Sequence, residues 1–214
     1  MNFPGPIFWI WTASIISSGI FAAWYFNWRG ALTTAEVDRY IEKLHANTSM
    51  SAGQKEIIGA FLSNDDGGEF VMLNVIKFHD TKQPHPQTGE PTAPMKLLTE
   101  YQRQFLGQLF RRAGHPLYVA RKKGGYIDTF GRIEMPEYSF VSMVRYRSRR
   151  DLADAIVNTA FPEAHAYKMA AIEHTFNFPT QMTRIGVWGP GRIVPVLLAL
   201  IAAFLHIAIV TIRG

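Results

Sequence analysis

Two long apolar runs frame the sequence, and shorter amphipathic patterns lie between them. The first run, residues 7–26, contains no charged residue, and the second, residues 193–212, is interrupted only by Pro195, His206 and Thr211. Each run has twenty residues. As a helix, such a run spans about 30 Å, which is the thickness of the hydrocarbon core of a bilayer. The pattern therefore predicts two transmembrane helices.

Aromatic residues near the ends of both runs favour this prediction, because tryptophan and tyrosine prefer the membrane–water interface. They are Trp9, Trp11, Trp24, Tyr25 and Trp28 for the first run and Trp188 for the second. A cleaved signal peptide is the alternative for the first run, but no Lys or Arg precedes it and it exceeds the usual signal core. Small residues also recur at every fourth position of this run, a spacing that allows close helix contact. They form two ridges, Ser14–Ser18–Ala22 and Gly19–Ala23.

The charges beside the two runs predict their orientation. Basic residues lie between the runs at Arg29, Arg39, Lys43, Arg184 and Arg192, whereas outside them only Arg213 is basic. Basic loops stay preferentially on the cytoplasmic side. We therefore expect a protein of the inner (cytoplasmic) membrane with a cytoplasmic middle domain and both termini outside.

Between the runs, the periodicity predicts a small α+β domain. Helix signals mark residues 35–46, 55–62, 97–113, 149–158 and 162–171, and strand signals mark 69–78, 116–121, 137–146 and 173–178. Residues 64–68 read as a turn, and four prolines make 79–95 a loop. After a helical preface the order is β-α-β-β-α-β, the ferredoxin-like order. The expected organisation is a transmembrane helix in 1–30, the preface in 31–64, the ferredoxin-like α+β domain in 65–180 and a second transmembrane helix in 181–214.

Part of this domain resembles a known family. The segment NDDGGEFVMLNVIKF, residues 64–78, is similar to the opening of a dimeric α/β-barrel family of unknown function whose first strand reads like V-M-L-N-L-L-K-F. A helix with Tyr101, the segment VRYRSRRDL and a helix with Pro162, Glu163 and His165 extend the resemblance over about residues 33–179. The resemblance implies a dimeric α/β-barrel fold and a homodimer formed through the sheet, and it implies no reaction. Members of the family usually lack membrane spans, so this chain departs from them at both ends.

Composition and motifs narrow the possible chemistry. The absence of cysteine excludes disulfides, thiolate metal sites and a cysteine nucleophile. Residues 29–184 hold 20 of the 22 basic and all 17 acidic residues, so their net charge is only +3. So small an excess of basic residues does not favour a nucleic-acid partner. The sequence contains no phosphate loop, no nucleophile elbow and no paired-histidine metal motif. We therefore expect no metal site, and a non-catalytic protein is favoured over an enzyme.

Three residues are candidates for a ligand cleft in the middle domain. Asn74 lies inside an apolar strand, where its amide needs partners. Tyr101 and His165 lie on predicted helices that would cover the same sheet. The alternative is that Asn74 makes a structural hydrogen bond and His165 lies on a helix surface.

His206 is the candidate cofactor ligand, because an imidazole inside an apolar span requires a partner. The run around it resembles the span of bacterial light-harvesting α polypeptides. It has Trp188, Pro190 and Arg192 before the span and Ala202 four residues before the histidine. This resemblance implies bacteriochlorophyll at His206. Haem is a second possibility, although the first run offers no second histidine, and a packing histidine bonded to a neighbouring helix is the third.

The sequence as a whole favours a membrane-anchored accessory or structural subunit of a larger membrane assembly. Its expected partners are membrane lipid, other membrane subunits and a second copy of its α+β domain. The alternatives are a light-harvesting antenna polypeptide that uses His206, and a membrane-anchored enzyme or small-molecule-binding protein that uses the cleft near Asn74, Tyr101 and His165.

Overall fold

The structure is a computed structural model that describes residues 5–46, 50–131, 137–157, 161–182 and 189–213. The chain divides into two units, a helix pair from the two ends of the chain and an α+β domain, Arg29–Met182. Arg184 and Trp188, which contributed to the sequence predictions, lie outside the described residues.

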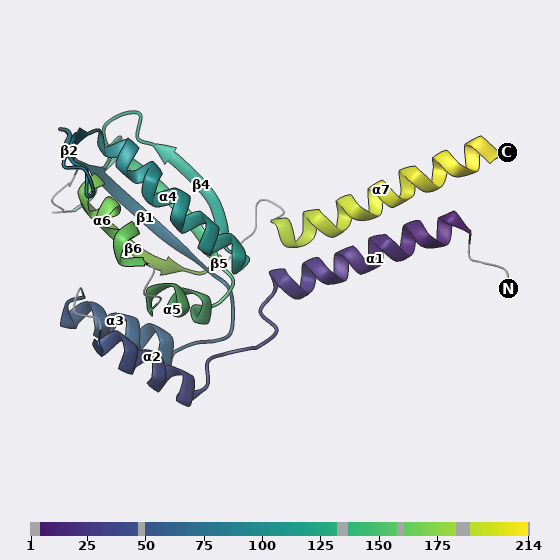
Figure 1. The fold of residues 1–214 in the computed structure, drawn as a ribbon, viewed down its shortest axis with the longest axis horizontal. Helices are drawn as coiled ribbons and strands as arrows, with labels where there is room; N and C mark the ends of the chain where they lie inside the picture. Colours follow the sequence, from purple (N-terminus) through teal and green to yellow (C-terminus); the bar gives the residue numbers. More distant parts are fainter. Residues whose placement is uncertain (1–4, 47–49, 132–136, 158–160, 183–188, 214) are drawn as a thin grey trace. The chain divides into compact units, whose positions relative to one another are not determined.

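The helix pair consists of α1 (Pro6–Tyr25) and α7 (Pro190–Arg213), drawn in purple and yellow in Figure 1. Both helices are long and apolar enough to cross a membrane, and only 6% of each candidate span is buried. A core helix of a soluble protein would instead be mostly covered. The two predicted apolar helices are therefore confirmed.

The two helices run antiparallel, with small residues between them. Trp11 contacts His206, while at the other end a Cβ added to Gly191 would lie 2.9 Å from the ring of Tyr25. The ridge of Ser14, Ser18 and Ala22 is half-buried, whereas Gly19 and Ala23 are exposed. The first ridge therefore serves the contact between the two helices, and the second faces outward.

The α+β domain is built on one antiparallel sheet of four strands in the order β4-β5-β1-β6. The strands are β1 (Phe70–Phe78), β4 (His115–Arg121), β5 (Phe140–Tyr146) and β6 (Ile172–Thr180). The helices are α2 (Thr34–Ala46), α3 (Ala52–Ser63), α4 (Pro94–Arg111), α5 (Arg149–Val157) and α6 (Phe161–Ala171). Each predicted strand and helix of the domain is present, with ends shifted by a few residues. The α+β class is therefore confirmed.

The predicted loop at 79–95 contains a short hairpin that the sequence did not predict. Its strands are β2 (Gln83–Pro84) and β3 (Pro91–Thr92). A proline in each strand removes a backbone donor, so the usual strand signals were missing. Helix α4 also begins three residues earlier than predicted, because Pro94 occupies its first turn, where a missing N–H costs nothing.

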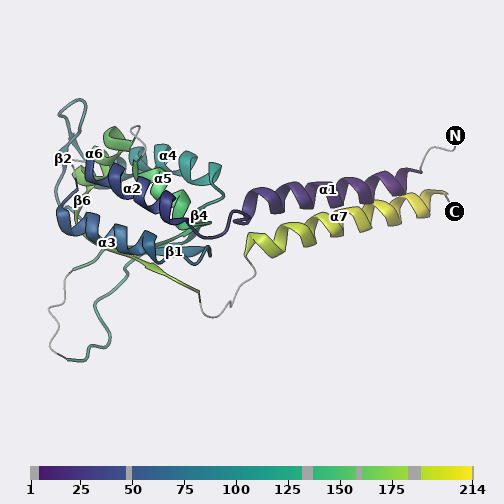
Figure 2. The ribbon, with the colours of Figure 1, turned by 90° about the horizontal axis from the view of Figure 1, so that it is seen from below.

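Helices α4, α5 and α6 cover one face of the sheet, as Figures 1 and 2 show. Phe70, Met72, Ile76 and Phe78 alternate along β1 and pack on this face. Helices α2 and α3 form a further cluster with α5 around Leu44, Leu62 and Ala153. The predicted helical preface therefore packs on the domain rather than standing apart from it.

Candidate functional site

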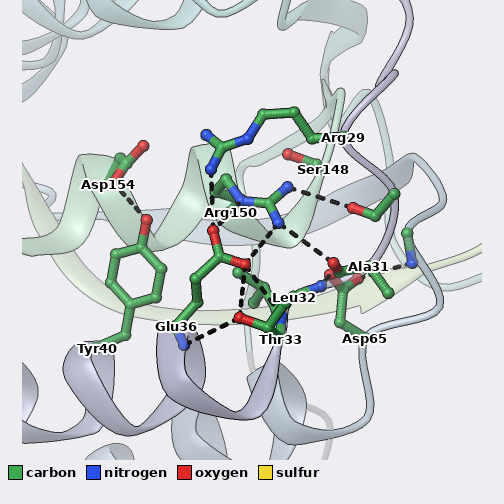
Figure 3. A network of polar contacts seen from close by, with 12 residues as sticks. Arg29, Ala31, Leu32, Thr33, Glu36, Tyr40, Asp65, Ser148, Arg150 and Asp154 are labelled. Atoms are coloured by element: carbon green, nitrogen blue, oxygen red, sulfur yellow. Dashed lines mark hydrogen bonds and ion pairs between the residues drawn. The ribbon is translucent and has the colours of Figure 1, made fainter.

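A buried arginine at the start of α5 holds the segment that precedes α2, as Figure 3 shows. The Arg150 guanidinium donates to the carbonyl oxygens of Gly30 and Ala31, each at 3.2 Å. It also binds both carboxylate oxygens of Glu36, at 3.1 and 3.0 Å. We call this set, Arg150 with residues 30–36, the arginine clamp.

Glu36 links the arginine clamp to the N-terminus of α2. Its carboxylate accepts hydrogen bonds from the backbone N–H and the hydroxyl of Thr33, while the Thr33 hydroxyl accepts from the N–H of Glu36. The two residues thus form a reciprocal capping box. The hydrogen bond from Arg150, reinforced by those from Thr33, lowers the pKa of Glu36 to about 2. The carboxylate is therefore held in its charged form and is not a proton donor at neutral pH.

Two further polar contacts fix the same region. Asp65 accepts a hydrogen bond from the Leu32 N–H at 2.8 Å, and Tyr40 donates to Asp154 at 2.6 Å. Burial, together with the bond to Asp154, raises the pKa of Tyr40. Gly67, at φ +74°, lies so close to Ala31 that an added Cβ would be 2.6 Å from its nitrogen. Arg150 and Glu36 neutralise each other, and the remaining contacts fix the backbone. The region therefore suits a structural role better than a catalytic one.

The second candidate site is the sheet face opposite the helices, which we call the open face. Directly paired residues of neighbouring strands share a face, so the register identifies its members. They are Val71, Leu73, Val75 and Lys77 of β1, Val141, Met143 and Arg145 of β5, His174, Phe176, Phe178 and Thr180 of β6, and His115, Tyr118 and Ala120 of β4. None of the three buried apolar clusters formed by the described residues includes a side chain from the open face.

The open face is apolar at its centre and charged at its two ends. Phe176, Tyr118 and Phe178 are 59%, 53% and 48% exposed. At one end Lys77 binds Asp80 at 2.7 Å and Glu137 at 3.3 Å, and at the other Arg145 binds Glu69. Exposed aromatic side chains ringed by paired charges are typical of a protein–protein contact surface.

The predicted cleft residues lie in separate surroundings. Asn74 lies on the helix-covered face, and its amide donates to the carbonyls of Met72 and Ser142 at 3.2 and 3.4 Å. Tyr101 stacks on Phe105 and packs against the apolar cluster, where burial raises its pKa. His165 is exposed on α6. A small pocket at the C-terminal end of α4, lined by Phe105, Gln108 and Tyr146 among others, contains none of the three. A shared ligand cleft at these residues stays a prediction.

His206 contacts the first helix of the pair through Trp11. The Trp11 indole N–H donates to His206 Nδ1 at 3.3 Å, and the two rings meet edge to face. An indole nitrogen is a donor only, so Nδ1 uses its lone pair to accept. In a neutral imidazole the one hydrogen is then on Nε2, and neither nitrogen offers a lone pair to magnesium or iron. The arrangement therefore does not fit a pigment or haem ligand, and ligation at His206 stays a prediction that requires Trp11 to move.

Sequence analysis missed the pair of His85 and Glu100. His85 Nε2 lies 3.0 Å from Glu100 Oε2, while His85 Nδ1 accepts from the N–H groups of Gln87 and Thr88. The ring also meets Tyr167 edge to face at 5.3 Å between centroids. With both nitrogens used, His85 attaches the β2–β3 hairpin to α4 and α6. No motif spacing marks such a pair. Among the described residues, no group of three His, Asp or Glu side chains is placed to hold a metal.

Comparison with known proteins supports the fold alone. The sequence matches no protein-family model, and no curated protein matches it. Two solved structures of the RPA0582 protein resemble the chain. The methylated protein has a TM-score of 0.53 at 20% identity over 62% of this chain and 94% of its own. The other, from Rhodopseudomonas palustris and described as a protein of unknown function, has a TM-score of 0.52 at 19% identity over 61% and 95%.

Proposed function

We propose that the chain is a membrane-anchored accessory subunit whose α+β domain pairs with a second copy through the open face. The observation that carries this proposal is the exposure of Phe176, Phe178 and Tyr118 on a sheet face that no described helix cluster covers. Exposing several large aromatic side chains to water is unfavourable by roughly 25 cal/mol per Å² of apolar surface. A partner that covers this face removes that cost.

The strand order supports a ferredoxin-like arrangement for the domain. In chain order the four long strands are β1, β4, β5 and β6, and in the sheet the first lies between the third and the fourth. Helix α4 follows the first strand, and α5 and α6 precede the last. This agrees with the β-α-β-β-α-β order of the sequence prediction. The family resemblance implies that two such domains pair through their sheets.

An accessory role is favoured over a catalytic one by the state of the polar groups. In the described residues, the carboxylates of Glu36 and Asp65 are engaged with Arg150 and a backbone N–H group respectively, and both nitrogens of His85 are used. Such groups position parts of the fold and hold no free proton-transfer pair. The two apolar helices, exposed along most of their length, provide the anchor.

The test compares two exposed phenylalanines of equal accessibility. Phe178, on the open face, and Phe110, on α4, are each 48% exposed. In full-length protein reconstituted in nanodiscs or detergent, Phe178→Glu should lower the dimeric fraction at least about tenfold, because two charges would be buried against each other. Phe110→Glu should leave it unchanged. Photobleaching steps or sedimentation would measure the stoichiometry, and a wild-type monomer or an unaffected Phe178→Glu dimer would contradict the proposal.

A further inference from the structure

We infer that His206 donates a hydrogen bond from Nε2 to an acceptor oxygen on a transmembrane helix of a different subunit. The inference rests on the proposed function, because it names the partner chemistry of an accessory subunit within the membrane. It assigns the imidazole the role of a donor and not that of a metal ligand.

The protonation of the ring follows from Trp11. A charged imidazolium would carry a hydrogen on Nδ1 and could not accept the indole N–H that lies 3.3 Å away. The ring is therefore neutral, and its one hydrogen is on Nε2. Trp11 thus selects one tautomer and leaves His206 with one donor to satisfy.

No acceptor for Nε2–H is present among the described residues, where the indole of Trp11 is the one hydrogen-bond partner of His206. The side chain is half-buried in the helix pair, so part of the ring faces outward. His206 lies well inside the apolar run, and six residues separate it from Arg213, the next charged residue. Hydrocarbon supplies no water to bond to this N–H, and a polar group left unpaired there is costly. A neighbouring helix with an oxygen at the depth of His206 removes this cost.

A second copy of the chain is a poor source of that oxygen. Its own His206 would present the same protonated Nε2 and the same occupied Nδ1, so two such rings cannot bond. Among the described span residues, the exposed hydroxyls are those of Ser17 and Thr211. Ser17 is six residues from Trp11 and Thr211 five from His206, so they lie roughly 9 and 7.5 Å away along the axes. Thr12 has the right depth, and its side chain is half-buried as that of His206 is, so the test below includes the chain's own oligomer among its outcomes.

The experiment follows the full chain in detergent-extracted native membranes on a native gel. His206→Leu removes the donor, whereas His206→Gln keeps an N–H donor and an acceptor for Trp11. The fraction of chain in the high-mass assembly should fall roughly three- to tenfold in His206→Leu, the range for a hydrogen bond between membrane helices. It should stay within about twofold of wild type in His206→Gln. Ile207→Leu, at an exposed apolar position beside His206, is the control and should change nothing.

The outcomes separate this inference from the proposed function. If wild type migrates no larger than its own dimer, the accessory role is wrong. If a larger assembly forms and His206→Leu enters it as well as wild type does, the donor role alone is wrong. A visible or near-infrared absorption band that disappears in His206→Leu would show a metal ligand instead. If His206→Leu instead dissociates the chain's own oligomer, the partner is a second copy and the inference is wrong.

A second measurement covers the case in which His206→Leu does not accumulate. Nitrogen-15 NMR of the wild-type assembly, with histidine labelled and the resonance assigned by its loss in His206→Gln, reports the tautomer directly. A hydrogen-bonded proton on Nε2 is the expected result. A proton on Nδ1 would overturn the inference, because Trp11 would then not be the donor to that nitrogen.

Discussion

At the scale of single residues, the arginine clamp depends on one carboxylate with a depressed pKa. Glu36 has a pKa of about 2 in the folded chain against an ordinary value of 4.5, with the Arg150 hydrogen bond as the largest cause. A lowered folded-state pKa means that the stabilisation is complete above about pH 4.5 and is lost as the pH falls from there through 2. Acid should therefore remove the stabilisation that the clamp provides over this pH range, although the Glu36 carboxylate itself stays charged until the pH approaches 2.

This gives a prediction for full-length protein in detergent. The free energy of unfolding in urea should be lower at pH 3 than at pH 6, and Glu36→Gln should reduce this difference. At pH 6 the same substitution should cost about 2 kcal/mol, because it removes charge-assisted bonds to the buried Arg150. Glu42→Gln, on an exposed part of the same helix, should leave the pH dependence unchanged. An equal pH response in wild type and Glu36→Gln would contradict this role.

Two glycines with the same backbone conformation provide a matched pair for the second prediction. Gly67 has φ +74° and faces the backbone of Gly30 and Ala31, whereas Gly89 has φ +73° and open space around it. Gly89→Ala should cost only the left-handed strain, about 1 kcal/mol. Gly67→Ala adds a backbone clash at 2.6 Å and should cost about 2–4 kcal/mol. Urea midpoints would measure both, and equal losses would mean that the close approach to Ala31 is not important.

Sequence reasoning at this scale reached only contacts that are local in the chain. The capping box of Thr33 and Glu36 is a local contact of this kind, because its members are three residues apart. The bonds from Arg150 to Glu36 and from Trp11 to His206 join residues 114 and 195 positions apart. No motif records such a separation. The need of His206 for a partner could therefore be predicted, but the partner could not.

At the scale of elements, the hydrophobic pattern predicted helices and strands well, because α2, α4 and α5 each have one apolar face and β1 is an apolar run. The exceptions were the β2–β3 hairpin, masked by its prolines, and the early start of α4 at Pro94. The sequence also offered two small-residue ridges on α1 without deciding between them. The structure uses Ser14, Ser18 and Ala22 against α7, and it leaves Gly19 and Ala23 outside.

The helix pair yields a third prediction. A side chain at Gly191 would meet the rings of Tyr25 and Phe26 at 2.9 and 3.1 Å, whereas nothing lies within 4 Å of one at Gly19. Gly191→Val should weaken the pair by about 1 kcal/mol, which is roughly fivefold. Gly19→Val should have no such effect. The chain has no cysteine, so one can be introduced at each of positions 11 and 206 without interference. The rate at which Trp11→Cys and His206→Cys form a disulfide then measures the pairing of the two helices, both in the Gly191→Val protein and in the Gly19→Val protein. A Gly191→Val rate equal to that of Gly19→Val would refute the close contact.

At the scale of the whole molecule, membrane topology is the prediction that depends on charge alone. The basic residues beside the two apolar runs, among them Arg29, Arg39 and Lys43, predict a cytoplasmic domain. Protease added to intact spheroplasts should leave residues 29–184 uncut, and the same protease should cut them in inverted vesicles. Cleavage in intact spheroplasts would mean that the domain is translocated despite its charges.

The pairing of β1 with β6 has a consequence for biosynthesis. Val71 lies opposite Thr180, so the central strand lacks one neighbour until more than a hundred further residues have been translated. Strand pairs so distant in sequence close slowly, because the intervening loop must lose its freedom first. Helix α7 begins ten residues after β6 ends, so the two segments are synthesised in close succession. Closure of the sheet and membrane insertion of the second helix therefore follow each other closely, and until then the unpaired edge of β1 is a site where a chaperone or a second nascent chain can bind.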